Sequence, residues 1–229
     1  MTTDAAVLRR NLLTAVPFLI AVPIMIGLVA IRLGIDLRVG PLIAGAVGWI
    51  VALVLRAPVA AIAMRRTQDR ERAQPIITAA SGPLEEVVRL VFLLLLGRDV
   101  NTAVSLGLGW AAVEVVYAIA SGFAVTALVG RTDPEAEQAR ALLPPMMLSS
   151  SAPWWGVVER IWASLLHIGF TLIVAAQPIL VIATAIVHSA TNMLLMREIR
   201  RGASPATINA AGAVLALAVV SVGAWLIGR

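Results

Sequence analysis

The 229-residue chain lacks cysteine and lysine, and it contains two histidines and one tyrosine. Without cysteine, neither a disulfide framework nor a thiolate metal site is possible. All 18 basic residues are arginines, and they give the chain a formal net charge of +5. Most of these arginines lie between apolar segments. This placement suits contact with the anionic headgroups of membrane lipid, and we expect no nucleic acid as a partner.

Charged residues are scarce as well. They make up 14% of the chain, hydrophobic residues make up 60%, and the mean hydropathy is +0.93. Soluble domains contain roughly 45–50% apolar residues, so this composition predicts a membrane protein. No stretch has the composition of a second, soluble domain. We therefore predict a single integral membrane domain over residues 1–229.

Long apolar runs follow one another along the whole chain. A helix of about 20 apolar residues is long enough to cross a bilayer. The sequence predicts an all-α, polytopic transmembrane helix bundle with seven such helices. The expected spans cover about residues 12–31, 41–64, 75–96, 101–128, 154–176, 178–196 and 206–227. Tight connections after the third and fifth spans each predict an antiparallel pair of helices.

The distribution of arginines predicts the orientation of the bundle. With the N-terminus inside, the cytoplasmic segments hold eleven arginines and the opposite side holds four. Cytoplasmic segments of membrane proteins are enriched in basic residues. We therefore expect an N-in, C-out topology.

The longest connection lies between the fourth and fifth spans. Asp133 followed by Pro134 is a typical helix start, which predicts a short helix to about Leu143. Pro144 and the apolar residues after it are expected at the membrane interface, and Trp154 would anchor the next span there. This loop is either a surface connector or a flexible lid over a functional site.

The third span carries the most unusual segment, Ser81–Leu90, which places two carboxylates and a guanidinium inside an apolar run. Glu85 and Glu86 precede Arg89 by four and three residues, so on a helix both carboxylates can reach it. Charges at membrane depth are costly and usually face protein or water. Such residues indicate a functional site.

A helix break is expected just before these charges, at Gly82 and Pro83. Proline removes a backbone donor, and glycine tolerates a break. We expect a kink or a helix restart that puts Glu85 and Glu86 in the first helical turn, where the helix dipole favours anionic side chains. Backbone groups freed at this depth need protein or water partners, which suggests a cavity.

Four further polar residues are expected at a similar depth on other spans. From the tight turn after the third span, Glu86 is about 12 residues back and Glu114 about 15 residues forward, so at roughly 1.5 Å per residue their depths differ by about 5 Å. His167 and His188 lie ten residues on either side of the next tight turn and are therefore level. Asn192 follows His188 by four residues and shares its face. This polar layer is either a functional site or a structural hydrogen-bonding network.

Carboxylates and neutral imidazoles in one layer can activate water. A glutamate shielded from water can act as a general base, and imidazole or carboxamide donors can stabilise the oxyanion of an attacked peptide carbonyl. Alternatively, Glu85, His167 and His188 would hold a divalent metal such as zinc and leave one position open for water. The spacing does not match the His-Glu-x-x-His motif of soluble zinc proteases. We favour a mechanism without a cofactor.

In chain order these residues form a pattern of four parts. The parts are Glu85-Glu86-Val-Val-Arg89, the mid-span Glu114, Glu159-Arg160 leading to His167, and His188-Ser-Ala-Thr-Asn192. This ordered set resembles the YhfC family, which belongs with the PrsW-like and CAAX-protease/bacteriocin-processing (CPBP) intramembrane proteases. The likeness extends to the loop with Pro144 and Trp154 and covers about residues 45–195.

The resemblance implies a protease of a bacterial-type plasma membrane with a proteolytic core at about residues 75–196. The implied roles are a water-activating Glu85, whose electrostatics Glu86 and Arg89 shape, a water-orienting His167, and an oxyanion site of His188 and Asn192. Glu114 fits the YhfC and PrsW pattern. CAAX-type members typically carry Phe four residues before the first histidine, where this chain has Ala163, and this departure bears on substrate preference.

We therefore predict an intramembrane endopeptidase of the cell membrane. It would use glutamate-activated water to hydrolyse peptide bonds of a membrane-embedded or membrane-adjacent polypeptide. The alternative is a membrane transporter or ion-coupling protein with a carboxylate/histidine relay, whose signature would be an inverted repeat with paired broken helices. A third hypothesis is a non-catalytic scaffold in which the polar residues serve packing.

Overall fold

The computed structural model describes residues 4–141, 143, 145–149 and 151–229, and over these residues the chain is helical without a strand. The α-helices are α1 (Ala5–Arg32), α2 (Val39–Thr67), α3 (Arg70–Leu96), α4 (Val100–Val129), α5 (Pro134–Ala141), α6 (Ala152–Ala176), α7 (Val181–Arg200) and α8 (Pro205–Ile227). Two short 3-10 helices, η1 (Pro145–Leu148) and η2 (Pro178–Leu180), complete the order. The predicted all-α class is confirmed.

Acidic side chains define several helix starts. The Asp99 carboxylate accepts hydrogen bonds from the backbone N–H groups of Asn101 (3.1 Å) and Thr102 (3.2 Å) and so begins α4. The predicted start of α5 is confirmed, because Asp133 accepts the N–H of Ala136 at 3.0 Å. Helix α5 ends at Ala141. Pro144, which we expected at the membrane interface, lies outside the described residues.

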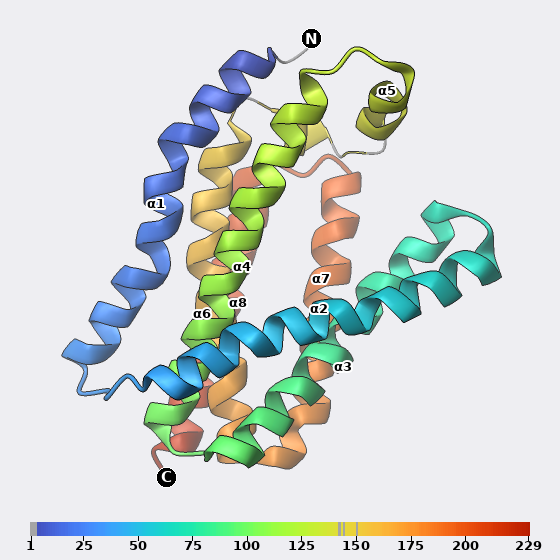
Figure 1. The fold of residues 1–229 in the computed structure, drawn as a ribbon. Coiled ribbons are helices and arrows are strands. Elements are labelled where there is room, and N and C mark those ends of the chain that lie inside the picture. The colour runs from blue at the N-terminus through green and yellow to red at the C-terminus, as the bar shows by residue number, and fades with distance from the viewer. Residues whose placement is uncertain (1–3, 142, 144, 150) are drawn as a thin grey trace.

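The helices fall into a bundle and an arm (Figure 1). Helices α1, α4, α6 and α8 run side by side, and α6 packs against both α4 and α8. Helix α2 crosses α4, pairs with α3, and continues with it away from the bundle as an arm. Helix α7 packs along α3. The start of α1 and the end of α8 lie at opposite ends of the molecule (Figure 1).

Six helices among the described residues are long and apolar enough to cross a membrane. They are α1, α2, α4, α6, η2 with α7, and α8. Seven spans were expected, and the one not in this set is the run at about 75–96. It lies in α3, which is long enough at 27 residues but carries Glu85, Glu86 and Arg89 within its apolar stretch. The sequence is thus a multi-pass membrane chain by helix length and composition.

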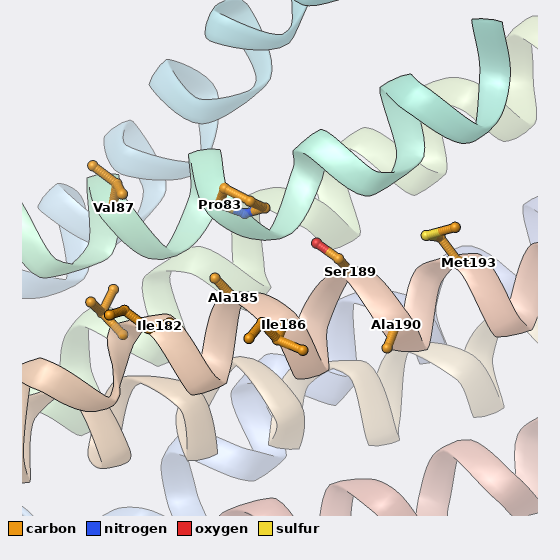
Figure 2. A pocket seen from close by; sticks show the side chains of 9 residues that line it. Pro83, Val87, Ile182, Ala185, Ile186, Ser189, Ala190 and Met193 are labelled. Carbon is orange, nitrogen blue, oxygen red and sulfur yellow. The ribbon is translucent and has the colours of Figure 1, made fainter.

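We expected a kink or a helix restart at Gly82–Pro83, and the restart is wrong. Helix α3 runs without interruption from Arg70, so the two glutamates lie far beyond its first turn. Pro83 has no N–H for the carbonyl of Ala79, and Ser189 of α7 donates its hydroxyl to that oxygen at 2.7 Å. Figure 2 shows Pro83 facing Ser189 across an apolar groove between α3 and α7. The neighbouring helix therefore satisfies the freed carbonyl, and no break is needed.

Glycine allows the close contacts that bring the helices together. A Cβ atom on Gly82 would meet the backbone carbonyl of Ala185 in α7. At the crossing of α2 and α4, a Cβ on Gly109 would collide with the backbone of Leu42, and one on Gly45 with the backbone of Leu106. These contacts are backbone to backbone, so a larger residue would push the helices apart. They hold the middle of α3 against α7 and the first part of α2 against α4.

Candidate active site

A cavity of about 680 Å³ lies where the arm meets the bundle, with a lining from α1 to α4, η1 and α6 to α8. We call it the central cavity. Its lining is mainly apolar, with a group of charged and amide side chains on its walls. These are Arg56, Gln74, Glu85, Glu114, Glu159, Arg160, His167, His188, Asn192 and Asn209. Five of the six residues of the predicted polar layer therefore line one space, and the sixth, Glu86, lies behind them.

Glu86 holds one of the two histidines. Its side chain is 0% exposed and accepts hydrogen bonds from Arg89 Nε at 3.0 Å and from His188 Nδ1 at 2.9 Å. An ionised carboxylate can only accept, so this contact puts the hydrogen of a neutral His188 on Nδ1. The ring of Phe170 stacks on the imidazole with centroids 5.4 Å apart. His188 Nε2 is thereby left as an acceptor on the cavity wall.

Glu85 lies beside that acceptor. Its Oε2 accepts a hydrogen bond from the indole N–H of Trp110 at 3.0 Å, and its Oε1 pairs with Arg56 Nη2. The same Oε1 lies 3.8 Å from His188 Nε2. Two acceptors at this separation do not bond directly, but one water can donate a hydrogen to each of them. Glu85 and His188 thus form a site for a water with two acceptors.

The second histidine is enclosed by charged partners on both ring nitrogens. Arg89 Nη2 lies 3.3 Å from His167 Nδ1, and Glu114 Oε2 lies 2.6 Å from His167 Nε2. Because arginine can only donate, Nδ1 is the acceptor, and the hydrogen of a neutral imidazole is on Nε2, toward Glu114. The guanidinium also donates to the backbone carbonyl of His167 at 3.1 Å. The ring centroids of His167 and His188 are 6.0 Å apart.

Glu114 connects this histidine to a further ion pair. Arg160 Nη1 contacts Glu114 Oε1 at 3.0 Å, and its Nη2 contacts Glu159 Oε1 at 2.5 Å. The side chain of Glu159 is 44% exposed, whereas that of Arg160 is 11% exposed. A continuous chain of polar contacts therefore runs from the fully buried Glu86 to the accessible Glu159.

Asn192 closes the cavity wall on the α7 side. One N–H of its amide donates to Ser81 Oγ at 2.8 Å, and the Ser81 hydroxyl donates to the carbonyl of Thr78 at 2.7 Å. A carboxamide carries two N–H donors. The second donor remains for a group inside the cavity.

Several contributors to this site were not singled out from the sequence. Trp110 donates to Glu85, and its ring lies under the guanidinium of Arg89 with the carbon 4.4 Å from the ring centroid. Phe170 orients His188, and Thr171 accepts a hydrogen bond from Arg89. Arg56 was noticeable as an arginine within an apolar span, but nothing in the sequence connects it to Glu85. The aromatic and hydroxyl residues carry no such signal.

A metal does not fit these residues. Both ring nitrogens of His167 are engaged, by Arg89 and Glu114, and Glu85 is paired with Arg56. Two guanidinium groups next to the proposed ligands oppose a divalent cation. No group of three or more His, Asp or Glu side chains among the described residues is arranged to hold a metal ion. We therefore derive no step through a metal.

No protein-family model matches the chain, and no curated protein or solved structure is significantly similar to it. The resemblance to the YhfC family therefore rests on the residue pattern alone.

Proposed function

We propose that the protein is an intramembrane endopeptidase whose reaction takes place in the central cavity. The observation that supports this proposal is the pair Glu85 and His188, with Oε1 and Nε2 3.8 Å apart on the wall of a cavity of about 680 Å³. Both groups can accept hydrogen bonds, and both are nearly buried, with Glu85 3% and His188 6% exposed. This is the arrangement that general-base hydrolysis requires.

The reaction begins with a water that donates one hydrogen to Glu85 and the other to His188. Glu85 takes the first proton while the water oxygen bonds to the carbonyl carbon of the peptide, whose oxygen becomes an oxyanion. The free N–H of Asn192 donates to this oxyanion. When the carbon–nitrogen bond breaks, protonated Glu85 gives its proton to the leaving amine. The new carboxylic acid loses its remaining proton to His188, and the products are a carboxylate and an amine.

The buried residues behind the cavity support this reaction. Glu86 fixes the tautomer and direction of His188, and Arg89 balances the charge of Glu86. His167 donates to Glu114, so in this state its role is to join Arg89 to Glu114. The water-orienting role that the resemblance implies for His167 passes to His188 in this proposal.

The proposal includes α3 as the seventh membrane span. The three charged side chains in its middle are buried against protein, with Glu85 3% exposed and Glu86 and Arg89 0% exposed. They therefore avoid the cost of facing hydrocarbon. The start of α1 and the end of α8 at opposite ends of the molecule support an odd number of crossings (Figure 1). The distribution of arginines supports an N-in, C-out topology. The proposal places the protein in a cell membrane, with a membrane-embedded or membrane-adjacent polypeptide as its substrate.

Substitution of the proposed base tests the function. The purified protein is placed in proteoliposomes with a set of synthetic peptides, each with one apolar helical segment, in water enriched in oxygen-18. We expect cleaved peptides with oxygen-18 in the new carboxyl group, and a loss of about 10³-fold or more with Glu85→Gln. Glu71→Gln is the matched control, because Glu71 is exposed on the same helix. Cleavage by Glu85→Gln at the wild-type rate would show that Glu85 is not the base.

A transporter or ion-coupling protein is the second candidate, because Glu85, Glu114, His167 and His188 line one cavity and carboxylate and histidine side chains can also form proton relays. Its expected signature of paired broken helices gains no support from α3, which is continuous. A pH-sensitive dye inside the liposomes tests this candidate. Proton flux that depends on Glu114, without peptide cleavage, would favour transport over hydrolysis.

A further inference from the structure

We propose that Arg56 of α2 and Trp110 of α4 are positioning residues that together fix the carboxylate of Glu85 on the cavity wall. Each contacts a different oxygen of the carboxylate, Arg56 at Oε1 and Trp110 at Oε2. They come from two helices other than α3, which carries Glu85. The catalytic part of this inference rests on the proposed function, whereas the contact itself can be tested without it.

The situation of Arg56 is hard to explain by packing. An arginine within an apolar span is costly at membrane depth. Its Nε is buried and, among the described residues, is the one buried side-chain donor or acceptor without a hydrogen-bond partner. Leaving such a donor unpaired costs further free energy. The guanidinium nevertheless lies at the cavity wall, 24% exposed, in an ion pair with Glu85. The placement of Arg56 is therefore explained by its ion pair with Glu85.

Trp110 contacts both Glu85 and Arg89 of α3. Its side chain is fully buried, its N–H donates to Glu85, and its ring lies under the guanidinium of Arg89. A smaller side chain would release both contacts, but phenylalanine would retain a ring under Arg89 and lose the N–H. The indole donor and the aromatic face can therefore be separated by substitution.

Two anchors give a carboxylate a defined plane, whereas one leaves it free to rotate about its last torsion. With both in place, Oε1 points at His188 Nε2 across 3.8 Å. Misplacement of a reacting group by about 1 Å can cost about 10²-fold in rate. Arg56 and Trp110 therefore act through Glu85 and touch neither the peptide nor the water in the proposed reaction.

A double-mutant cycle tests the contact without any assay of activity. Arg56→Met is made in the wild-type chain and in Glu85→Gln, and the midpoint of thermal unfolding is measured in detergent. We expect Arg56→Met to lower the midpoint by about 5–10 °C in the wild type and by less than half as much in Glu85→Gln. Arg66→Met, an exposed arginine near the end of the same helix, should change neither midpoint. If Arg56→Met lowered the unfolding midpoint equally in the wild type and in Glu85→Gln, the contact between Arg56 and Glu85 would be disproved.

The kinetics of peptide cleavage test the positioning role, with the same peptides in proteoliposomes. We expect Arg56→Met to lower kcat by about 10²-fold with KM within about twofold, and Arg56→Lys to recover most of the loss. Trp110→Phe should lower kcat by about tenfold, because it loses the N–H and keeps the ring. Trp225→Phe, an exposed tryptophan of α8, should be unchanged.

The two experiments distinguish failure of the positioning role of Arg56 from failure of the proposed function. Wild-type kcat in Arg56→Met, together with a positive cycle, would overturn the positioning role while leaving the contact. A wild-type chain that cleaves no peptide would overturn the proposed function, and the cycle would then still decide whether Arg56 holds Glu85.

Discussion

The middle of α3 and the connections between helices carry the same kinds of charged residue in opposite surroundings. In α3, the ion pair of Glu86 and Arg89 is fully buried. In the connections, Arg38 and Asp99 form a pair at 2.9 Å with side chains 43% and 46% exposed, and Arg131 pairs with Asp133 at 2.8 Å. Exposed pairs contribute little to stability, whereas a buried charge that loses its partner is strongly destabilising.

The comparison also concerns what each pair holds together. Arg38 and Asp99 join the α1–α2 connection to the α3–α4 connection, next to the start of α4. Arg131 and Asp133 are two residues apart and lie at the start of α5. By contrast, Glu86 and Arg89 contact side chains of α4, α6 and α7. The buried pair therefore sets the geometry of a site, and the exposed pairs set the paths of loops.

Removal of Glu86 should have the largest effect on stability. Glu86→Ala leaves Arg89 buried without its carboxylate and His188 without its orienting partner, at a cost of about 3–5 kcal/mol. For a chain of this size, each kcal/mol lowers the unfolding midpoint by about 2–4 °C. Asp133→Asn, in an exposed pair, should leave the midpoint unchanged. Equal shifts for the two variants, measured by thermal unfolding in detergent, would contradict the distinction between buried and exposed pairs.

The two histidines should respond differently to the same substitution. His188 presents a free Nε2 to the cavity, whereas both ring nitrogens of His167 are engaged. We expect His188→Gln to lower kcat for peptide cleavage by about 10²-fold or more, with a small change in unfolding midpoint. His167→Gln should lower the midpoint more and kcat less. If His188→Gln affected stability alone, the polar layer would serve packing, as the scaffold hypothesis states.

Regular helix geometry explains why much of the site could be predicted from the sequence. A constant rise per residue places side chains counted from a tight turn at known depths. Such counting put His167 and His188 at one level and Glu114 at a depth similar to that of Glu86, and His167, His188 and Glu114 all line the central cavity. The apolar runs predicted the long helices, because a segment that crosses a membrane must satisfy its own backbone hydrogen bonds and a helix does so.

The remaining features depend on contacts between helices, which periodicity does not reveal. Gly82 and Pro83 predicted a kink or a helix restart, but α3 is continuous and Ser189 on another helix satisfies the freed carbonyl. The ion pair of Arg56 with Glu85 joins residues 29 positions apart on different helices, and no local pattern predicts it. The sequence does not show that the N–H of Trp110 donates to Glu85, because the two residues lie on different helices. Local sequence fixes where a side chain lies along its helix, and tertiary packing decides what it meets.

The smallest expected effect concerns the pH dependence of the exposed pair at the start of α4. Partial burial opposes ionisation of Asp99, but hydrogen bonds from Thr102 and the Arg38 guanidinium outweigh it and lower the pKa of this carboxyl below its ordinary value. The unfolded chain therefore binds a proton at higher pH than the folded chain does. The contribution of Asp99 to stability is complete above its ordinary pKa and is lost as the pH falls through the lower, folded value.

Because Asp99 is about half exposed, we expect this contribution to be about 0.5 kcal/mol, or about 1–2 °C in the unfolding midpoint. Asp99→Asn keeps an oxygen that can cap α4 and removes the charge, so it should lower the midpoint at about pH 6, and this effect should shrink as the pH falls below the ordinary pKa of the carboxyl. High salt should reduce the difference at pH 6, because exposed charges are screened. If the difference persisted unchanged at low pH and in high salt, the stabilising role of Asp99 would come from its hydrogen bonds. Its charge would then play no part in the difference between the connections and the middle of α3.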